Sequence, residues 1–315
     1  KAKKLKCIDD IILQRLIEGD LEEDIIKRKD IDWFLIDANC AIHPTCFKVL
    51  KEIEGDINNS KLEGKMINAV IEYFEHLINY VSPVKGVLLS IDGVAPAAKI
   101  KQQRYRRFKS IYDRDLENRI RQKHNKEEKK HWNNSAITPG TEFMERLHNK
   151  INSWIREKKD AKDKSKITYK TIIYSSCKTP SEGEHKLLQF IKDNKEKKEI
   201  YSYVVYGLDA DLIFLTLAAN NPNIYLLREA NELDKKNKGS SNELNYVSID
   251  SLRDFIFSTV NSIIEHKNIE LKDSENMELE NSKSENEDSE VFTSIPEDKK
   301  MNIINDFIFI CYLLG

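Results

Sequence analysis

Acidic residues follow short apolar segments of strand type at four places along the chain. If these segments are parallel strands of one sheet, their carboxyl ends open onto one edge, where the ligands of α/β folds bind. Two like charges ~4 Å apart repel by about 4 kcal/mol at an effective dielectric of 20, so such a cluster needs cations. Oxygen ligands favour Mg²⁺ or Mn²⁺ over zinc. The acidic residues are Asp37, Asp92, Glu182, Glu184, Asp209 and Asp211.

Phosphodiester hydrolysis with two divalent ions is the chemistry typical of such a cluster. One ion generates the attacking hydroxide, and the other stabilises the leaving oxygen. Each acid taken singly could instead cap a helix, because Asp and Glu favour helix starts. Glu182 and Glu184 are examples of this alternative. A Glu-x-Glu pair and an Asp-x-Asp pair at one sheet edge together favour the metal cluster.

A basic stripe follows the second of these strands. Lys99, Gln103, Arg106 and Arg107 stand at i, i+4, i+7 and i+8, which places them on one face of a helix. The planar fork of arginine matches phosphate oxygens, and lysine adds a point charge. A solvated basic helix face is the alternative interpretation. Because Asp92 lies only seven residues before the stripe, we expect a bound phosphate about one nucleotide away from the metals.

The elements that must position these residues alternate between strands and helices. A strand, a helix and a second strand within about sixty residues form a βαβ unit, which implies parallel pairing. The sequence therefore predicts an α/β fold with a mostly parallel central sheet flanked by helices. Strands are predicted at 33–37, 87–92, 171–174, 203–209 and 223–227, and helices at 66–81, 97–131, 143–155, 180–191, from 211 onward, and at 248–265.

Bulk composition limits the class of protein. With 315 residues, 40% of them hydrophobic and 33% charged, the chain can build a large core; residues 1–315 are interpreted as one domain. Its acidic segment 268–299 has few apolar residues, which predicts a disordered loop. The net charge of -2 means that a nucleic-acid partner must be recognised by local patches.

Cysteine usage and hydropathy indicate an intracellular protein, either cytoplasmic or nuclear. The five cysteines form no Cys-x-x-Cys pair, which fits a reducing compartment. No apolar run reaches the roughly 20 residues that span a bilayer, so no membrane partner is expected. A zinc site at Cys40, His43 and Cys46 is a weaker alternative, because three ligands in seven residues lack the usual second half.

Four segments resemble signatures of the Xrn family of 5′→3′ exoribonucleases, in the family's order and over most of the chain. The family usually has glycine where this chain has Ser181. Its Gly-Asn-Asp-Phe motif, with a further metal-ligating Asp, would follow Gly315, so the chain looks like the first catalytic block of a longer protein, cut at both ends. Alone it is expected to be weakly active or inactive. The four segments are Ile91–Phe108, Ile137–Met144, Glu182–Lys186 and Tyr206–Ile213.

The resemblance implies a PIN/FEN-like nuclease core that degrades 5′-monophosphorylated single-stranded RNA, with two Mg²⁺ or Mn²⁺ ions. It implies that the six acids form the metal site and that His43 contacts the first base. It also implies that the basic stripe, Lys99, Gln103, Arg106 and Arg107, binds the 5′-phosphate.

Other classes remain open at the level of sequence. A flap or structure-specific DNA nuclease shares the acidic edge, although it needs the basic stripe less. A non-catalytic RNA-binding scaffold would have lost metal ligands, yet all six acids are present. A metal-dependent glycosyltransferase or phosphatase could use Asp209 and Asp211, but it would require neither the Glu182/Glu184 pair nor the basic stripe.

Overall fold

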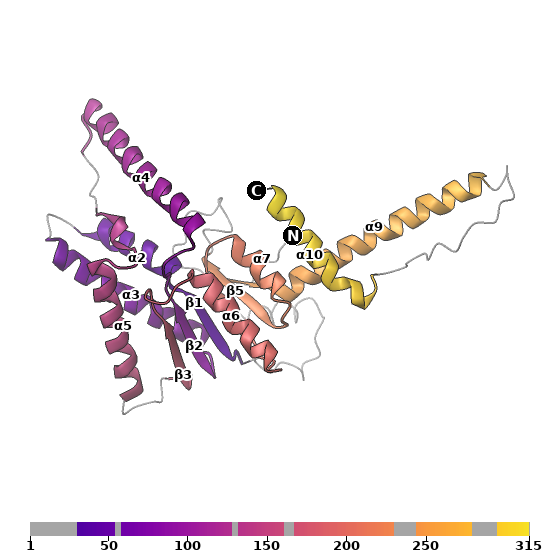
Figure 1. Ribbon diagram of the computed structural model, residues 1–315, viewed down its shortest axis with the longest axis horizontal. Helices are drawn as coiled ribbons and strands as arrows, with labels where there is room; N and C mark the ends of the chain where they lie inside the picture. Colours follow the sequence, from indigo (N-terminus) through magenta and orange to yellow (C-terminus); the bar gives the residue numbers. More distant parts are fainter. Residues whose placement is uncertain are drawn as a thin grey trace, which may run out of the picture.

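One six-stranded sheet organises the molecule, in the order β3-β2-β1-β4-β5-β6 (Figure 1). The computed structural model describes residues 30–53, 58–127, 132–160, 167–229, 244–278 and 295–314. Strands β1 to β5 pair in parallel, and β6 runs antiparallel to β5, which confirms the predicted α/β class. The strands are β1 (Trp33–Asp37), β2 (Gly86–Ser90), β3 (Thr171–Ser175), β4 (Tyr203–Tyr206), β5 (Ile224–Glu229) and β6 (Leu244–Ser248).

The central strands are apolar on both faces because helices cover both sides of a parallel sheet. Every residue of β2 and β4 is buried, whereas β3 at the edge of the sheet has only exposed and half-buried side chains. One face is covered by α2 (Ala38–Glu52), α3 (Asn59–Val81) and α5 (Glu142–Asp160). The other face is covered by α6 (Gly183–Glu196), α7 (Asp211–Ala218), α9 (Ile249–Glu278) and α10 (Glu297–Leu314).

Two hydrophobic cores lie on the two faces of the sheet. Phe34 packs into the core beneath α2, α3 and α5, and its neighbour Leu35 packs into the core beneath α6 and α7. This alternation follows from the period of two along a strand. Trp154, at helical spacing with Phe143 on α5, is 4% exposed and belongs to the first core. The cores fix the strands, and the strands fix the edge on which the acids lie.

The carboxyl edge of the sheet is where the helices begin. Helix α2 starts immediately after β1, α6 starts eight residues after β3, and α7 starts five residues after β4. Helix α2 and strand β6 were not predicted from the sequence, although the buried residues of α2, such as Ala38, Ala41 and Ile42, stand at helical spacing. In the described ranges, no helix combines the length and the apolarity needed to span a membrane.

Helix α4 (Ala97–Lys123) follows β2 and stands away from the rest of the molecule (Figure 1). It contains no buried residue. The predicted helix over 97–131 is too long, because Asn125 adopts a left-handed conformation with φ of 49° and ends it. Residues 128–131 lie outside the described part of the chain.

The expectation of a disordered loop over 268–299 is wrong at both ends. Helix α9 continues to Glu278, and α10 already begins at Glu297. The low apolar content suggested disorder, but Glu, Lys, Leu and Met are strong helix formers and can extend a helix that is anchored elsewhere. Residues 279–294 of this segment lie outside the described residues.

Candidate metal and nucleic-acid site

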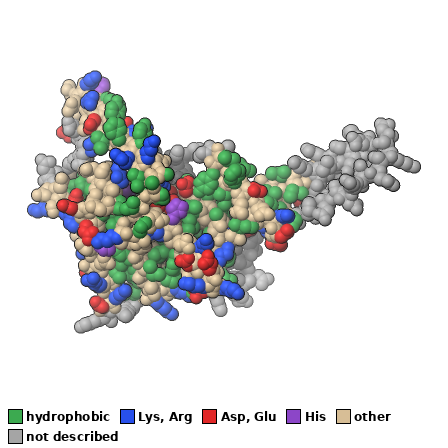
Figure 2. Space-filling model, viewed as in Figure 1, with side chains coloured by type: hydrophobic (Ala, Val, Ile, Leu, Met, Phe, Trp, Pro, Cys, Tyr) green, Lys and Arg blue, Asp and Glu red, His purple; other side chains and the backbone are tan. Residues whose placement is uncertain are grey.

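All six predicted acids lie at the carboxyl edge of the parallel strands. Asp37 is the last residue of β1, and Asp92 lies two residues after β2. Figure 2 shows acidic and histidine side chains gathered at the foot of α4. The six acids differ in their exposure to solvent. Asp37, Glu182 and Glu184 are buried, Asp92 is half-buried, and Asp209 and Asp211 are exposed.

Hydrogen bonds hold two carboxylates of the edge, that of Asp37 at the end of β1 and that of Asp92 after β2. The Asn39 side chain donates to Asp92 Oδ2 at 2.6 Å, and the Gly183 N–H donates to Asp92 Oδ1 at 2.6 Å. The Asn39 N–H and the Cys40 thiol both donate to Asp37 at 3.3 Å. Asp37 therefore does cap α2, as the alternative interpretation of single acids allows. Both carboxylates are held in fixed orientations beside each other.

Glu182 does not follow the capping interpretation. It is the N-cap residue of α6, yet its side chain makes no capping hydrogen bond. Instead its Oε2 atom accepts from the Lys99 ammonium at 2.6 Å. This ion pair joins the acidic edge to the first turn of α4. The two predicted sites, acidic and basic, are therefore in direct contact.

Gly183 lies between two carboxylates. A Cβ atom at this position would be 2.7 Å from Asp37 Oδ1 and 3.2 Å from Asp92 Oδ1. Only a glycine lets the first turn of α6 approach both acids this closely. Just before it, Ser181 has a φ of 92°, in the region that favours glycine. The family that the sequence resembles has glycine there, and a non-glycine residue in such a conformation costs about 1–3 kcal/mol.

Among the described residues, two groups of side chains could each hold a metal ion. Within each group, the potential ligand atoms all lie within 4.8 Å of one another. One comprises Asp37, Cys40 and Asp209, and the other Glu182, Glu184 and His185. The Oε2 atom of Glu184 is buried and has no hydrogen-bond partner. A buried carboxylate oxygen without a donor fits a cation, because leaving it unpaired is costly. The arrangement therefore suits divalent ions with oxygen ligands.

The zinc alternative is not supported by this arrangement. Cys40, His43 and Cys46 all lie on α2, but they do not form one of the potential ligand groups found in the described residues. Burial raises the pKa of both cysteine thiols, and the charge of Asp37 raises that of Cys40 further. Zinc ligation requires the thiolate. These cysteines are therefore neutral thiols, and Cys40 serves as a hydrogen-bond donor to Asp37.

Burial and mutual repulsion raise the pKa values of three acids of the edge. Burial, followed by the charges of Asp92 and Asp209, raises the pKa of Asp37 to about 7. Burial also raises the pKa of Asp92, with a contribution from Glu182, and the pKa of Glu184, with a contribution from Asp209. Such shifts are those expected where negative charges outnumber the nearby cations. A divalent ion would offset the repulsion among the acids, which adds to the effect of burial on these pKa values.

We expect the stability of the metal-free chain to fall as pH rises between 3.8 and about 7. The folded chain retains a proton on Asp37 that the unfolded chain loses in this window, so the free energy of unfolding decreases as pH rises. Mg²⁺ competes with that proton, and should raise the melting temperature more at about pH 8 than at about pH 5.5. Thermal denaturation with and without Mg²⁺ measures this. Asp37→Asn should reduce the difference between the Mg²⁺ effects on the melting temperature at the two pH values. If this difference did not change, Asp37 would not be the group at which Mg²⁺ and the proton compete.

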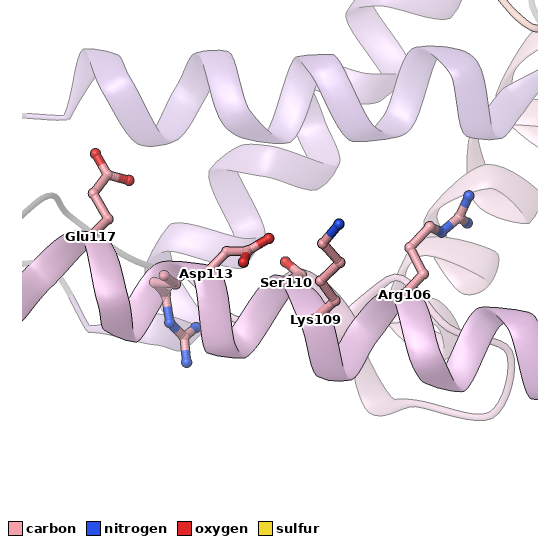
Figure 3. Close-up of a pocket in the computed structure, with 6 residues that line it drawn as sticks. Arg106, Lys109, Ser110, Asp113 and Glu117 are labelled. Atoms are coloured by element: carbon pink, nitrogen blue, oxygen red, sulfur yellow. The ribbon is translucent and has the colours of Figure 1, made fainter.

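The basic stripe occupies the first three turns of α4. Arg106 is exposed, and Gln103 and Arg107 are half-buried. Figure 3 shows the side chains along an open hollow on this helix, which has a volume of about 420 Å³ and is basic at one end and of mixed charge at the other. Acids and bases alternate along the helix beyond its third turn. The hollow is lined by Arg106, Lys109, Ser110, Asp113, Arg114 and Glu117.

His43 lies close enough to Arg106 of the basic stripe to be affected by its charge. It is half-buried on α2, and burial followed by the positive charge of Arg106 lowers its pKa. The ring is therefore neutral at neutral pH and lies near the basic stripe. A neutral, flat ring in this position can contact a nucleobase while Arg106 contacts a phosphate.

Several residues at the site were not identified from sequence. Asn39 and Cys40 directly follow Asp37, so their position after a strand that ends in an acid could have indicated them. Lys186 and Arg228 could not be found in this way, because their partners lie 95 and 20 residues away along the chain.

The chain matches a known family over most of its length. The family model described as "XRN 5'-3' exonuclease N-terminus" covers residues 5–230. Among similar proteins, "5'-3' exoribonuclease 2" of Kluyveromyces lactis is 33% identical over 268 residues, which are 77% of this chain and 26% of that protein.

Two further relatives carry the same name. The protein of Saccharomyces cerevisiae is 37% identical over 216 residues, 64% of this chain and 21% of that protein. The protein of Debaryomyces hansenii is 29% identical over 337 aligned residues, 96% of this chain and 31% of that protein. The chain thus spans between 21% and 31% of the length of these three relatives.

Proposed function

Because the chain belongs to the XRN 5'-3' exonuclease family, we propose that it is the catalytic part of a 5′→3′ exoribonuclease. Its substrate is single-stranded RNA with a 5′-monophosphate, and its cofactors are two Mg²⁺ or Mn²⁺ ions. The observation that carries this proposal is the contact between an acidic edge and a basic stripe, made by the ion pair of Lys99 with Glu182. A nuclease that starts at a phosphorylated end needs both.

The acidic edge holds the ions. When bound, the ions supply Lewis-acid activation of the phosphodiester and stabilise the negative charge that develops on it. The buried acids Asp37, Glu182 and Glu184 provide oxygens at the floor of the site, and the exposed Asp209 and Asp211 provide oxygens at its rim. Asn39 and Gly183 orient Asp92 through hydrogen bonds of 2.6 Å, so this carboxylate does not need to reorganise. The ligand set is Asp37, Asp92, Glu182, Glu184, Asp209 and Asp211.

The basic stripe holds the 5′ end. Arg106 and Arg107 donate forked hydrogen bonds to a terminal phosphate, Gln103 donates through its amide, and Lys99 adds charge at the border with the acids. A monophosphate dianion satisfies these donors, whereas a 5′-hydroxyl leaves them without an acceptor. A triphosphate adds charge and bulk that the stripe does not accommodate, because Asp113 and Glu117 follow further along α4.

The direction of degradation follows from the order in which the two parts of the site would meet the RNA. When the stripe holds the 5′-phosphate and His43 contacts the first base, the phosphodiester that follows the first nucleotide lies beside the acids. Hydrolysis there releases one nucleotide and leaves a new 5′-monophosphate on the remaining RNA. The product of each step is therefore a substrate for the next, which accounts for repeated 5′→3′ action.

We also propose that the protein works inside the cell. Cys40, Cys46, Cys177 and Cys311 are free thiols in the part of the chain that the structure describes. Free, partly exposed thiols such as those of Cys40 and Cys311 persist in a reducing compartment.

Arg106→Ala is expected to lower the preference for 5′-monophosphorylated RNA by roughly tenfold to a hundredfold, because a charge-assisted hydrogen bond contributes about 1.5–3 kcal/mol. Rates on 5′-phosphate, 5′-hydroxyl and 5′-triphosphate forms of one RNA measure this preference. Arg119→Ala is a matched control, since Arg119 is an exposed arginine on the same helix beyond the stripe.

Three outcomes would count against the proposal. Equal rates of the unchanged protein on all three RNAs would show that no 5′-phosphate site exists. The same loss of preference in the Arg119 variant would assign the effect to overall charge. Equal or faster hydrolysis of a single-stranded DNA of the same sequence would favour a DNA nuclease of the same superfamily.

A further inference from the structure

A half-buried lysine ties together two loops at the acidic edge. The ammonium group of Lys186, on the first turns of α6, donates to the carbonyl oxygen of Ile91 at 2.7 Å and to that of Ser176 at 3.1 Å. Ile91 immediately precedes Asp92, and Ser176 follows β3. The side chain therefore fixes the peptide group that leads into one of the metal-site aspartates.

A buried arginine makes the same kind of contact with the loop that follows β4. Arg228, near the end of β5, is 6% exposed, and its guanidinium donates to the carbonyl oxygen of Leu208. Leu208 immediately precedes Asp209. Its N–H donates to the sulfur of Cys40 at 3.3 Å, so both polar groups of this residue are held. The loop that carries Asp209 is thereby fixed from α2 on one side and from β5 on the other.

The chemistry of a peptide group explains what such a contact controls. The carbonyl of one residue and the Cα atom of the next lie in one plane, so holding the carbonyl holds the Cα atom from which the following side chain extends. Lys186 thus sets the direction of Asp92, and Arg228 sets that of Asp209. Neither cation forms a salt bridge with these carboxylates in the described residues. The charges of Lys186 and Asp92 still influence each other, and the hydrogen bonds to the preceding carbonyls add a control through the backbone.

Stability alone does not account for these two cations. Burying a charge without a paired carboxylate is costly, and apolar replacements of buried ionic groups are often neutral or stabilising. The Nε atom of Arg228 is buried without a hydrogen-bond partner, which adds to this cost. Both residues lie where a backbone carbonyl directly precedes an acid of the edge.

We propose that Lys186 and Arg228 are positioning residues of the metal site. They hold Asp92 and Asp209 in the orientation that binds a divalent ion, and their loss weakens ion binding although every ligand remains. The inference rests on the proposed function, because it takes these two aspartates as ligands.

The chain offers one control of the same residue type for each position. Arg253 differs from Arg228 in its ion pair with Asp250, and Lys195 differs from Lys186 in being exposed. Arg253 is 9% exposed, has an unpartnered Nε atom like that of Arg228, and donates to the carbonyl of Asn221 at 3.1 Å. Lys195 donates to two backbone carbonyls, that of Asn220 at 2.7 Å and that of Ala219 at 3.3 Å. These carbonyls follow α7, at the end of the helix away from the acidic edge.

The test is the binding of Mn²⁺ to the protein without RNA, followed by the electron paramagnetic resonance signal of free Mn²⁺. Lys186→Met and Arg228→Met should bind Mn²⁺ about 10- to 100-fold more weakly, the loss typical of residues that orient metal ligands. Lys195→Met and Arg253→Met should stay within about twofold. Arg228→Lys keeps the charge and loses the planar fork, and should show about a tenfold loss while folding more readily than the methionine variant.

Circular-dichroism melting of each variant fixes a temperature at which all of them are folded. Equal affinity of the Lys186 and Arg228 variants and the unchanged protein would overturn the inference, as would an equal loss in the Lys195 and Arg253 controls. Asp209→Asn separates this failure from a failure of the proposed function. If Asp209→Asn weakens binding and the positioning variants do not, only the inference is wrong; if Asp209→Asn binds Mn²⁺ normally, the metal site itself is wrong.

Discussion

Asp209→Asn should lower the rate of RNA hydrolysis on the order of a thousandfold and leave RNA binding intact. Removal of one carboxylate weakens the hold on a divalent ion, and the ion contributes several kcal/mol to the transition state. Asparagine has nearly the same shape, and Asp209 is exposed, so the fold should not change. The negative charge of Asp209 repels RNA phosphates. Without this charge, the affinity for 5′-monophosphorylated RNA should stay equal or increase slightly.

Two measurements check this result. Single-turnover hydrolysis gives the rate, and fluorescence anisotropy with labelled RNA in the presence of Ca²⁺ gives the binding. Asp254→Asn is the control, because Asp254 is an exposed aspartate on α9 outside the acidic edge. If the Asp209 variant turned over RNA at the rate of the unchanged protein, Asp209 would not be a metal ligand. If the variant lost RNA binding, Asp209 would instead contribute to binding the RNA.

Gly183→Ala should lower turnover about a hundredfold with no loss of the preference for a 5′-phosphate. The new methyl group would approach Asp37 Oδ1 to 2.7 Å and Asp92 Oδ1 to 3.2 Å, so one of the two carboxylates must move. A displacement of reacting groups by ~1 Å can reduce a rate about a hundredfold. The basic stripe on α4 does not contact this position and should bind the 5′-phosphate as before.

Gly64→Ala is the matched control for this substitution. Gly64 lies within α3, and a Cβ atom there meets nothing within 4 Å. Replacing glycine by alanine in a helix stabilises it by roughly 0.5–1 kcal/mol, so this variant should melt slightly higher and keep full activity. If Gly183→Ala hydrolysed RNA at the normal rate, the close approach of α6 to the two acids would have no role in catalysis.

The sheet and the acidic edge could be predicted because both follow from local patterns. Apolar runs such as Val87–Ser90 mark strands that are buried on both faces, and parallel pairing brings the residues after those strands to one edge. The basic stripe follows in the same way from helical spacing. For the strands and the basic stripe, the spacing of apolar or basic residues along the sequence is enough to predict the element.

Contacts between distant segments could not be predicted, because no local pattern encodes them. The hydrogen bond of Lys186 to Ile91 joins residues that are 95 positions apart, and that of Lys99 to Glu182 joins residues that are 83 apart. Helix ends were also missed. The end of α4 depends on the conformation of Asn125, and the length of α9 depends on helix propensity in a segment whose composition suggested disorder.

The start of three helices at the carboxyl edge gives this edge an electric field of its own. Helices α2, α6 and α7 all begin there, and the amino-terminal end of a helix carries the equivalent of about half a positive charge. Part of the repulsion among the acids is therefore offset by the backbone itself, before any ion binds. If the chain acts on RNA as proposed, the same field would attract the phosphates of the approaching strand. The βα junctions that place the acids would then also reduce the barrier that those acids present to a polyanion.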